Sequence, residues 1–241
     1  MRKITINLAA VAAFCIVVAS PALVSSSCAT PQTEQEDTTI IREDLGITAL
    51  KYSSPEVPSS IEFCGKVIDL SRFDRHERMD RELLAFTYMH STSLQMLKKA
   101  NRYFPIVEPI LKENGIPDDF KYLMVIESNK NPTARSSAGA AGLWQFMQGT
   151  GRDYGLEVNN NVDERYHIEK ATRAACRYLK DAYAKYKDWV AVAASYNAGQ
   201  ARIASQLAKQ DVDDSLDLQL VEETARYVYR ILAAKQLFNA P

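Results

Sequence analysis

Glu127 is the residue whose type and position could do acid–base chemistry. Three apolar residues precede it at helical spacing, namely Phe120, Leu123 and Met124. Glu127 therefore falls on the same apolar face of a predicted helix. A carboxyl group beside an apolar wall resists ionisation, so its pKa rises and it can remain a proton donor near neutral pH. Helix geometry alone leaves a second interpretation open, a surface glutamate at a frayed helix end.

Further polar and polarisable side chains fall in the segments that follow. The stretch 136–142 is small and glycine-bearing, which lets the backbone approach a ligand closely. An amide such as Gln145 offers a donor and an acceptor, which suits a ligand with amide and hydroxyl groups. Glu223 and Tyr227 are four residues apart and so share a helix face. The candidate substrate-binding residues are Ser128, Ser136, Gln145, Met147, Tyr196, Asn197, Glu223 and Tyr227.

Most of these residues also have an ordinary structural interpretation, and residue type alone does not decide between the two. Small polar residues form turns, methionine and tyrosine fill cores, and acidic residues suit helix starts. The alternatives are a turn-forming Ser136, a capping or surface Gln145, a core Met147, a core Tyr196, a helix-start Glu223 and a packing Tyr227.

The elements that must position these residues are predicted to be helices, so the fold class is all-α. Pro117 with Asp118 and Asp119 suits the start of the central helix, and Asn131-Pro132 ends it. Residues 61–70 are expected to be an extended lead-in, with no convincing strand in the chain. Other helices are predicted at 74–90, 91–103, a short stretch around Pro105 and Pro109 ending at Asn114-Gly115, 143–154, 166–186, 189–197 and 221–238.

Composition excludes several classes of protein. The chain has 241 residues, 46% of them hydrophobic, and a formal net charge of -1. A nucleic-acid-binding protein usually has a basic surplus or stripe, and neither is present, so no nucleic-acid partner is expected. His76, His90 and His167 are scattered and form no zinc-protease motif. We expect no metal and no organic cofactor.

The N-terminus has the features of a targeting segment. Arg2 and Lys3 precede an apolar run at 8–19, so residues 1–28 are predicted to be a signal peptide that is removed on export. Cys28 loosely resembles a lipoprotein acylation site, although Ser25 replaces the usual large apolar residue. Lipidation at Cys28, with membrane anchoring, and simple secretion both remain open. Residues 29–60 are predicted to be a polar tether. Cys64 and Cys176 could pair in an oxidising compartment, but we expect two separate buried thiols.

Motifs in three separate places resemble those of one family. They are Glu127-Ser128 with Asn131-Pro132, Ser136 and the run Gly139-Ala140-Ala141-Gly142-Leu143-Trp144-Gln145; Ser195-Tyr196-Asn197-Ala198-Gly199; and Glu223-Thr224-Ala225-Arg226-Tyr227-Val228. Together they resemble the soluble lytic transglycosylase domain, glycoside hydrolase family 23 of the lysozyme-like superfamily, and most closely its membrane-bound D type. Two departures, Trp144 and Ser195, fall outside the residues assigned to chemistry. The resemblance covers about residues 116–238.

The resemblance implies a lysozyme-like catalytic domain at 116–241, with additional N-terminal helices at 61–115. It implies cleavage of the β-1,4 bond between N-acetylmuramic acid and N-acetylglucosamine in peptidoglycan glycan strands, in the bacterial cell envelope and facing the periplasm. Glu127 would act first as acid and then as base, with Tyr196 as a hydrogen-bond partner. The product would carry a 1,6-anhydromuramic acid end. A hydrolysing muramidase and a non-catalytic peptidoglycan-binding protein remain the alternatives.

Overall fold

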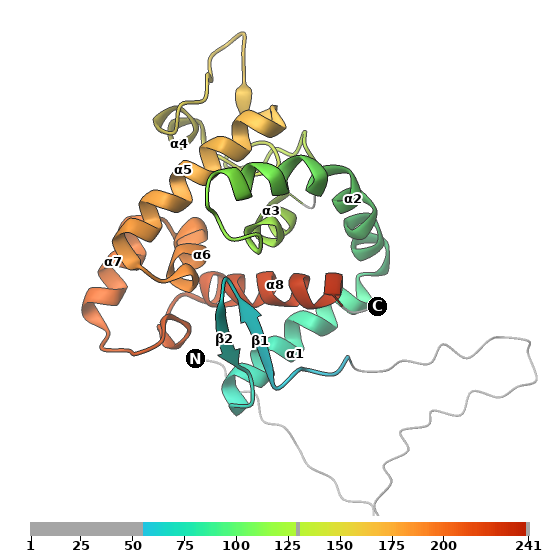
Figure 1. The fold of residues 1–241 in the computed structure, drawn as a ribbon, viewed down its shortest axis with the longest axis vertical. Helices are drawn as coiled ribbons and strands as arrows, with labels where there is room; N and C mark the ends of the chain where they lie inside the picture. Colours follow the sequence, from blue (N-terminus) through green and yellow to red (C-terminus); the bar gives the residue numbers. More distant parts are fainter. Residues whose placement is uncertain (1–54, 129–130, 240–241) are drawn as a thin grey trace, which may run out of the picture. The chain divides into compact units, whose positions relative to one another are not determined.

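The computed structural model describes residues 55–128 and 131–239, and these are mainly helical (Figure 1). The all-α expectation is therefore confirmed, whereas the predicted signal peptide, Cys28 and most of the tether lie outside the described residues. The helices are α1 (Phe73–Tyr88), α2 (His90–Glu113), α3 (Phe120–Ser128), α4 (Gln148–Asp153), α5 (Ile168–Tyr186), α6 (Trp189–Ala198), α7 (Gln200–Lys209) and α8 (Glu222–Asn239), with short 3₁₀ turns η2 (Glu164–Tyr166) and η3 (Ser215–Asp217).

A β-hairpin precedes the helices, so the expectation of no strand was wrong. Strands β1 (Ser60–Phe63) and β2 (Lys66–Asp69) pair antiparallel, with Ile61 opposite Ile68. The turn residues Cys64 and Gly65 have φ angles of 54° and 83°, as a two-residue hairpin turn requires. Alternate residues of β1 are buried, whereas Ile68 is the one buried residue of β2. A period of two over so few residues is too short to predict a strand from the sequence.

Helix α2 runs unbroken where two shorter helices were expected. Pro105 and Pro109 lie inside it, and both are exposed. A proline removes one helical hydrogen bond and crowds the carbonyl four residues earlier. On a solvent-facing stripe, water can satisfy the freed carbonyl, so the helix continues through both positions.

Helices α3 and α4 are shorter than predicted. Pro117 begins a turn, not the helix, because the Phe120 N–H bonds to the Pro117 carbonyl at 3.2 Å. Residues 143–147, predicted as helix, form turns and isolated bridges, and only Gln148–Asp153 is helical. Gln145 interrupts the predicted helix with a φ of 47°, in the left-handed region.

Helix α8 is the central packing element of the described fold. It packs against α1, α3 and α6, and Figure 1 draws it between α3 and α6 above and α1 below. The start of α3 and the hairpin are fastened to α8 by Lys235, whose ammonium lies 2.8 Å from Asp119 and 2.5 Å from the Glu62 carbonyl. Glu127 on α3 and Tyr227 on α8 are therefore held facing each other by the packing of these two helices.

The two cysteines within this frame are unpaired thiols. Cys176 is fully buried in α5, whereas Cys64 lies half-buried in the hairpin turn. Burial raises the pKa of the Cys176 thiol to about 11, which keeps it protonated and inert. None of the helices in the described part of the chain is both long and apolar enough to cross a membrane.

Candidate active site

Glu127 lies in the last turn of α3, and its carboxyl group is partly buried. The apolar residues that precede it on the same face, Phe120, Leu123 and Met124, are all 0% exposed. Burial raises the pKa of Glu127 from 4.5 to about 7. The ionised form loses hydration without gaining a full counter-charge. The apolar face of α3 predicts this shift. The raised pKa allows Glu127 to donate a proton near neutral pH.

The phenol that contacts Glu127 belongs to Tyr227, not to Tyr196. The Tyr227 hydroxyl donates a hydrogen bond to Glu127 Oε1, and its ring is 3% exposed. Tyr196 instead donates to the Trp144 carbonyl oxygen at 2.8 Å, so the expected Tyr196–Glu127 bond was wrong. Burial and the nearby Glu127 charge raise the pKa of both phenols well above its ordinary value, so both remain donors.

One face of α8 provides the groups that act on the Glu127 carboxyl. Glu223, Tyr227 and Arg230 recur at helical spacing, so they share that face. The Tyr227 hydrogen bond and the Arg230 charge lower the pKa of Glu127, whereas the Glu223 charge raises it. These effects are smaller than that of burial. Arg230 was missed in the sequence, although its position three residues after Tyr227 was the available signal.

A cavity of about 310 Å³ brings together four of the predicted substrate-binding residues. Its lining includes Gln145, Met147, Tyr196 and Asn197. Met147 is 46% exposed, so it is not a core residue. Asn197 Oδ1 accepts a hydrogen bond from Thr224 of α8 at 2.9 Å, which fixes the orientation of its amide. The cavity therefore offers an oriented amide, a phenol ring and a thioether to a ligand.

The loop before α4 holds Gln145 in place through backbone carbonyls. Gln145 Nε2 donates to the Gly142 oxygen at 2.7 Å and to the Ala134 oxygen at 3.3 Å. Its side-chain oxygen keeps acceptor capacity for a ligand. Ser136 closes a turn, accepting from the Ala140 N–H at 3.0 Å, and its hydroxyl proton remains free to donate to a ligand. That hydroxyl is also exposed.

Arg165 of η2 holds this loop in place through hydrogen bonds, a role that the sequence gave no signal for. It is 5% exposed and donates to the Gly139 and Phe146 carbonyls at 2.8 and 2.9 Å. Its remaining donors meet Asp163 at 2.9 and 2.7 Å, which lowers the pKa of that carboxyl. A guanidinium with its donors satisfied in this way ties the two ends of the loop together.

Trp144, where the family motif commonly has methionine, lies in the core and not in the cavity. It is 0% exposed, and its indole N–H donates to Thr172 Oγ1 at 2.9 Å. The departure from the motif therefore changes packing beneath the loop. Ser128 ends α3 directly after Glu127, and its side chain lies outside the described part of the structure.

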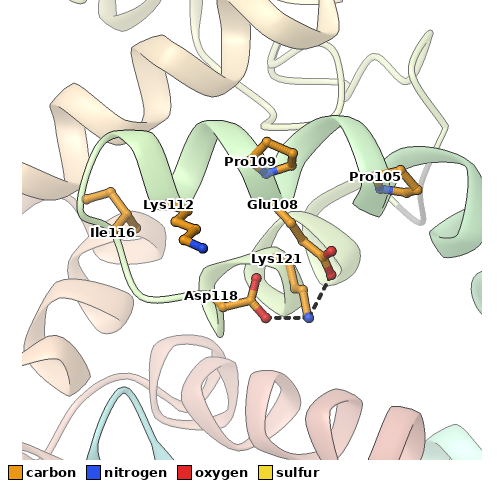
Figure 2. A pocket seen from close by; sticks show the side chains of 7 residues that line it. All are labelled: Pro105, Glu108, Pro109, Lys112, Ile116, Asp118 and Lys121. Atoms are coloured by element: carbon orange, nitrogen blue, oxygen red, sulfur yellow. Dashed lines mark hydrogen bonds and ion pairs between the residues drawn. The ribbon is translucent and has the colours of Figure 1, made fainter.

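A larger cavity, of about 660 Å³, lies at the other end of α3 from Glu127 (Figure 2). Figure 2 shows Lys121 joined there to Asp118 and to Glu108, the latter at 2.8 Å. The lysine is thus neutralised by two carboxylates within the cavity, which contains none of the predicted site residues. Among the described residues, no cluster of histidine, cysteine and acidic side chains has the arrangement of a metal site.

The raised pKa of Glu127 makes the free energy of unfolding depend on pH. The folded carboxyl binds its proton more tightly than the unfolded one, so this contribution is complete below pH 4.5 and is lost as pH rises through about 7. When the pH rises from about 4 to about 8, the free energy of unfolding of wild type should therefore fall by about 3 kcal/mol more than that of Glu127→Gln. Urea unfolding at both pH values checks this. Glu77→Gln, at an exposed site, is the control, and identical pH profiles for Glu127→Gln and wild type would contradict the burial of the acid.

The described fold and site define a helical domain with a buried carboxyl group, Glu127, whose charge acts on Tyr196, and Tyr196 lines a cavity of mixed polar and apolar side chains. Residues 105–217 match the family model described as the Transglycosylase SLT domain. The chain is 30% identical over 168 residues to membrane-bound lytic murein transglycosylase D of Escherichia coli K12, covering 68% of this chain and 36% of that protein. It thus spans about a third of the length of that relative.

Two further similarities cover smaller shares. Peptidoglycan transglycosylase gp16 of Escherichia phage T7 is 31% identical over 123 residues, which is 49% of this chain and 9% of that protein. The structure of an inactive mutant of lytic transglycosylase Slt from Pseudomonas aeruginosa aligns with a TM-score of 0.47 at 24% identity. That alignment covers 57% of this chain and 24% of the Slt chain.

Proposed function

We propose that this protein is a peptidoglycan lytic transglycosylase with Glu127 as its single catalytic acid and base. The observation that carries the proposal is the Glu127 carboxyl group, which burial holds at a pKa of about 7 and whose charge acts on Tyr196, a residue that lines a cavity with Gln145 and Asn197. The SLT domain and the names of the two transglycosylase relatives support the same reaction class. The substrate is then the β-1,4 bond between N-acetylmuramic acid and N-acetylglucosamine.

The reaction proceeds in two proton transfers through one side chain. Glu127 first gives its proton to the glycosidic oxygen, which leaves as the 4-hydroxyl of N-acetylglucosamine. The resulting carboxylate then accepts the proton of the muramic acid C6 hydroxyl as that oxygen bonds to C1. The product is a 1,6-anhydro ring, and no water is consumed. An attacking group within the same sugar has a very high effective concentration, which replaces a protein nucleophile.

Ordinary glycosidases need a second carboxylate across the sugar ring. The carboxylate that acts on the Glu127 pKa is Glu223, which is exposed at the start of α8. In our proposal Glu223 contacts the saccharide and raises the proton affinity of Glu127. A hydrolysing enzyme would instead use Glu223 to activate water, and its product would contain that water.

The cavity residues act as saccharide contacts in this proposal. Asn197, held by Thr224, orients an N-acetyl group of the glycan, and Gln145 accepts a sugar N–H or hydroxyl. Met147 and Tyr196 provide apolar surface for a sugar face. In this proposal Ser136, in the loop before α4, and Ser128, at the end of α3, also contact the glycan strand.

The protein would act in the bacterial cell envelope, facing the periplasm. The membrane-bound relative and the N-terminal targeting segment support this location, and a lipid on Cys28 would provide an anchor. Mass spectrometry of the mature N-terminus distinguishes an acylated Cys28 from a simple cleaved end.

Digestion of purified sacculi, followed by mass spectrometry of the released muropeptides, tests the function. We expect muropeptides with anhydromuramic ends, each lighter by one water than its hydrolytic counterpart. Reducing, hydrated ends would assign hydrolysis, and sacculus binding without any released product would assign a binding protein. Either result would reject the transglycosylase proposal.

Tyr227→Phe should shift the pH dependence of cleavage. The Tyr227 hydrogen bond favours the ionised carboxylate, so its loss raises the Glu127 pKa further. A hydrogen bond to a charged group contributes about 1.5–3 kcal/mol, which corresponds to about one to two pH units. The alkaline limb of kcat/KM, where Glu127 loses its proton, should move upward by that amount. Turnover at the optimum should fall because the carboxyl loses its orientation.

Tyr229→Phe is the matched control for this experiment. Tyr229 lies on the same helix and is 1% exposed, but its hydroxyl has no hydrogen-bond partner within the described structure. Its loss should leave the alkaline limb unchanged. An unshifted limb in Tyr227→Phe would show that the Tyr227–Glu127 bond does not act on catalysis.

A further inference from the structure

Helix α8 supplies Tyr227 and carries the motif at 223–228, yet like α1 it lies outside the segment that the SLT family model matches. The match covers residues 105–217, whereas α1 ends at Tyr88 and α8 begins at Glu222. The two helices pack directly on each other. Contacts between α1 and α8 can therefore set where α8 lies relative to Glu127.

An ion pair between the buried Glu82 of α1 and the partly exposed Arg226 of α8 joins these helices. Glu82 is 2% exposed, and its two oxygens accept from Arg226 Nε at 2.7 Å and Nη2 at 3.2 Å. Arg81 adds a contact to the same carboxylate at 3.3 Å. Such a two-point pair fixes orientation as well as distance, since both partners are planar. The Arg226 side chain remains 38% exposed, so it can adjust to a variant without complete desolvation.

Arg226 is the residue immediately before Tyr227. Consecutive helical residues point about 100° apart, so one side of α8 meets Glu82 while the adjacent side meets Glu127. A rotation or slide of α8 that loosened the first contact would move the Tyr227 hydroxyl. One residue of slippage is about 1.5 Å, which is enough to break a hydrogen bond.

We infer that Glu82 is a positioning residue of the active site, which holds α8 through Arg226 so that Tyr227 stays bonded to Glu127. Glu82 contacts neither the acid nor the cavity. It belongs to the N-terminal helical region at 61–115. The catalytic meaning of the inference rests on the proposed function, whereas the coupling itself is a property of the folded protein without substrate.

A second ion pair joins the same two helices and provides the comparison. Arg81 and Glu222 lie 2.7 Å apart, but their side chains are 45% and 70% exposed. Exposed pairs contribute little to stability or orientation. If any charge link between α1 and α8 sufficed, Glu222→Gln would act like Glu82→Gln. If the two-point contact between Glu82 and Arg226 positions α8, only Glu82→Gln changes the Glu127 pKa.

The test is a double-mutant cycle of Glu82→Gln and Tyr227→Phe, read out as the Glu127 pKa by carboxyl ¹³C NMR titration. The charged groups facing Glu127 are Glu223 and Arg230 on α8, with the phenols of Tyr196 and Tyr227. Of the groups that face Glu127, the Tyr227→Phe variant removes only the Tyr227 hydroxyl. Glu82→Gln should raise the Glu127 pKa in wild type and leave it unchanged in the Tyr227→Phe background.

Turnover on sacculi should follow the same coupling. Glu82→Gln should lower kcat about 3- to 10-fold with KM little changed, and should have no further effect on Tyr227→Phe. A purely structural role would lower the melting temperature and reduce activity equally in both backgrounds. Glu222→Gln should leave the Glu127 pKa at its wild-type value.

The inference would be overturned if the Glu127 pKa shifts of Glu82→Gln and Tyr227→Phe added in the double variant. An unchanged Glu127 pKa in Glu82→Gln would overturn it as well. Should Glu82→Gln fail to fold, Arg226→Lys serves the same cycle, because lysine keeps the charge but offers one contact point. The titration needs no substrate, so it decides the positioning role even if sacculus products reject the transglycosylase reaction. Product analysis decides that reaction separately.

Discussion

Glu127→Gln is expected to abolish turnover while leaving the fold and glycan binding intact. General acid–base catalysis contributes about 10²- to 10⁴-fold, and here one side chain performs both proton transfers, so the rate should fall about 10³-fold or more. Glutamine has nearly the same shape and can still accept the Tyr227 hydrogen bond. Release of muropeptides from sacculi measures turnover, and a sacculus pull-down measures binding.

The result must separate the acid from other carboxylates. Glu77→Gln, at an exposed position on α1, is the control and should retain full activity. Glu223→Gln should reduce activity less than Glu127→Gln, because we assign Glu223 to saccharide contact. Wild-type turnover in Glu127→Gln would mean that another residue is the proton donor.

Gly142→Ala should destabilise the protein and displace the loop that carries Gln145. Gly142 has a φ of 78°, and an added Cβ would lie 1.9 Å from the Arg165 carbonyl oxygen. Backbone cannot yield as a flexible side chain does, so the loop must move away from Arg165. We expect a loss of at least about 3 kcal/mol in the free energy of unfolding, with loss of cleavage.

Gly139→Ala separates the steric clash from backbone strain. Gly139 has a φ of 90°, but nothing lies within 4 Å of an added Cβ. Only the cost of a positive φ applies there, about 1 kcal/mol. Urea unfolding of both variants measures the difference. Equal losses would mean that the close approach of Gly142 to Arg165 is not what fixes the loop.

Helical periodicity predicted much of the fold because these helices bury one continuous face. The predicted helices at 166–186 and 221–238 correspond to α5 and α8 within a residue or two. The hairpin was missed because each strand has only four residues, too few to establish a period of two. The unbroken α2 was missed because exposure of its prolines is decided by tertiary packing.

The buried position of Glu127 was predictable from the sequence, but its phenol partner was not. Glu127 follows an apolar stripe within its own helix, a signal local to α3. Tyr227 is 100 residues further along the chain, and its contact depends on how α8 packs against α1, α3 and α6. Tyr196 lies in an equally suggestive motif, yet its hydroxyl bonds to the Trp144 backbone. Sequence spacing cannot choose between two such tyrosines.

The loop that holds Gln145 was predicted as helix for a related reason. Gln145 itself has a positive φ, which few residues other than glycine adopt without support. That support comes from its own side-chain amide and from Arg165, whose contacts reach the loop from η2. A conformation stabilised by distant partners leaves no trace in local propensity.

Titration of the Glu127 carboxyl by ¹³C NMR in the substrate-free protein tests the central claim most directly. The claim is that burial keeps a large fraction of this side chain protonated near neutral pH, so that it can give its proton to a glycosidic oxygen. The structure predicts a pKa of about 7. A pKa near the ordinary 4.5 would mean an ionised, solvated carboxylate, and would contradict Glu127 as the proton donor.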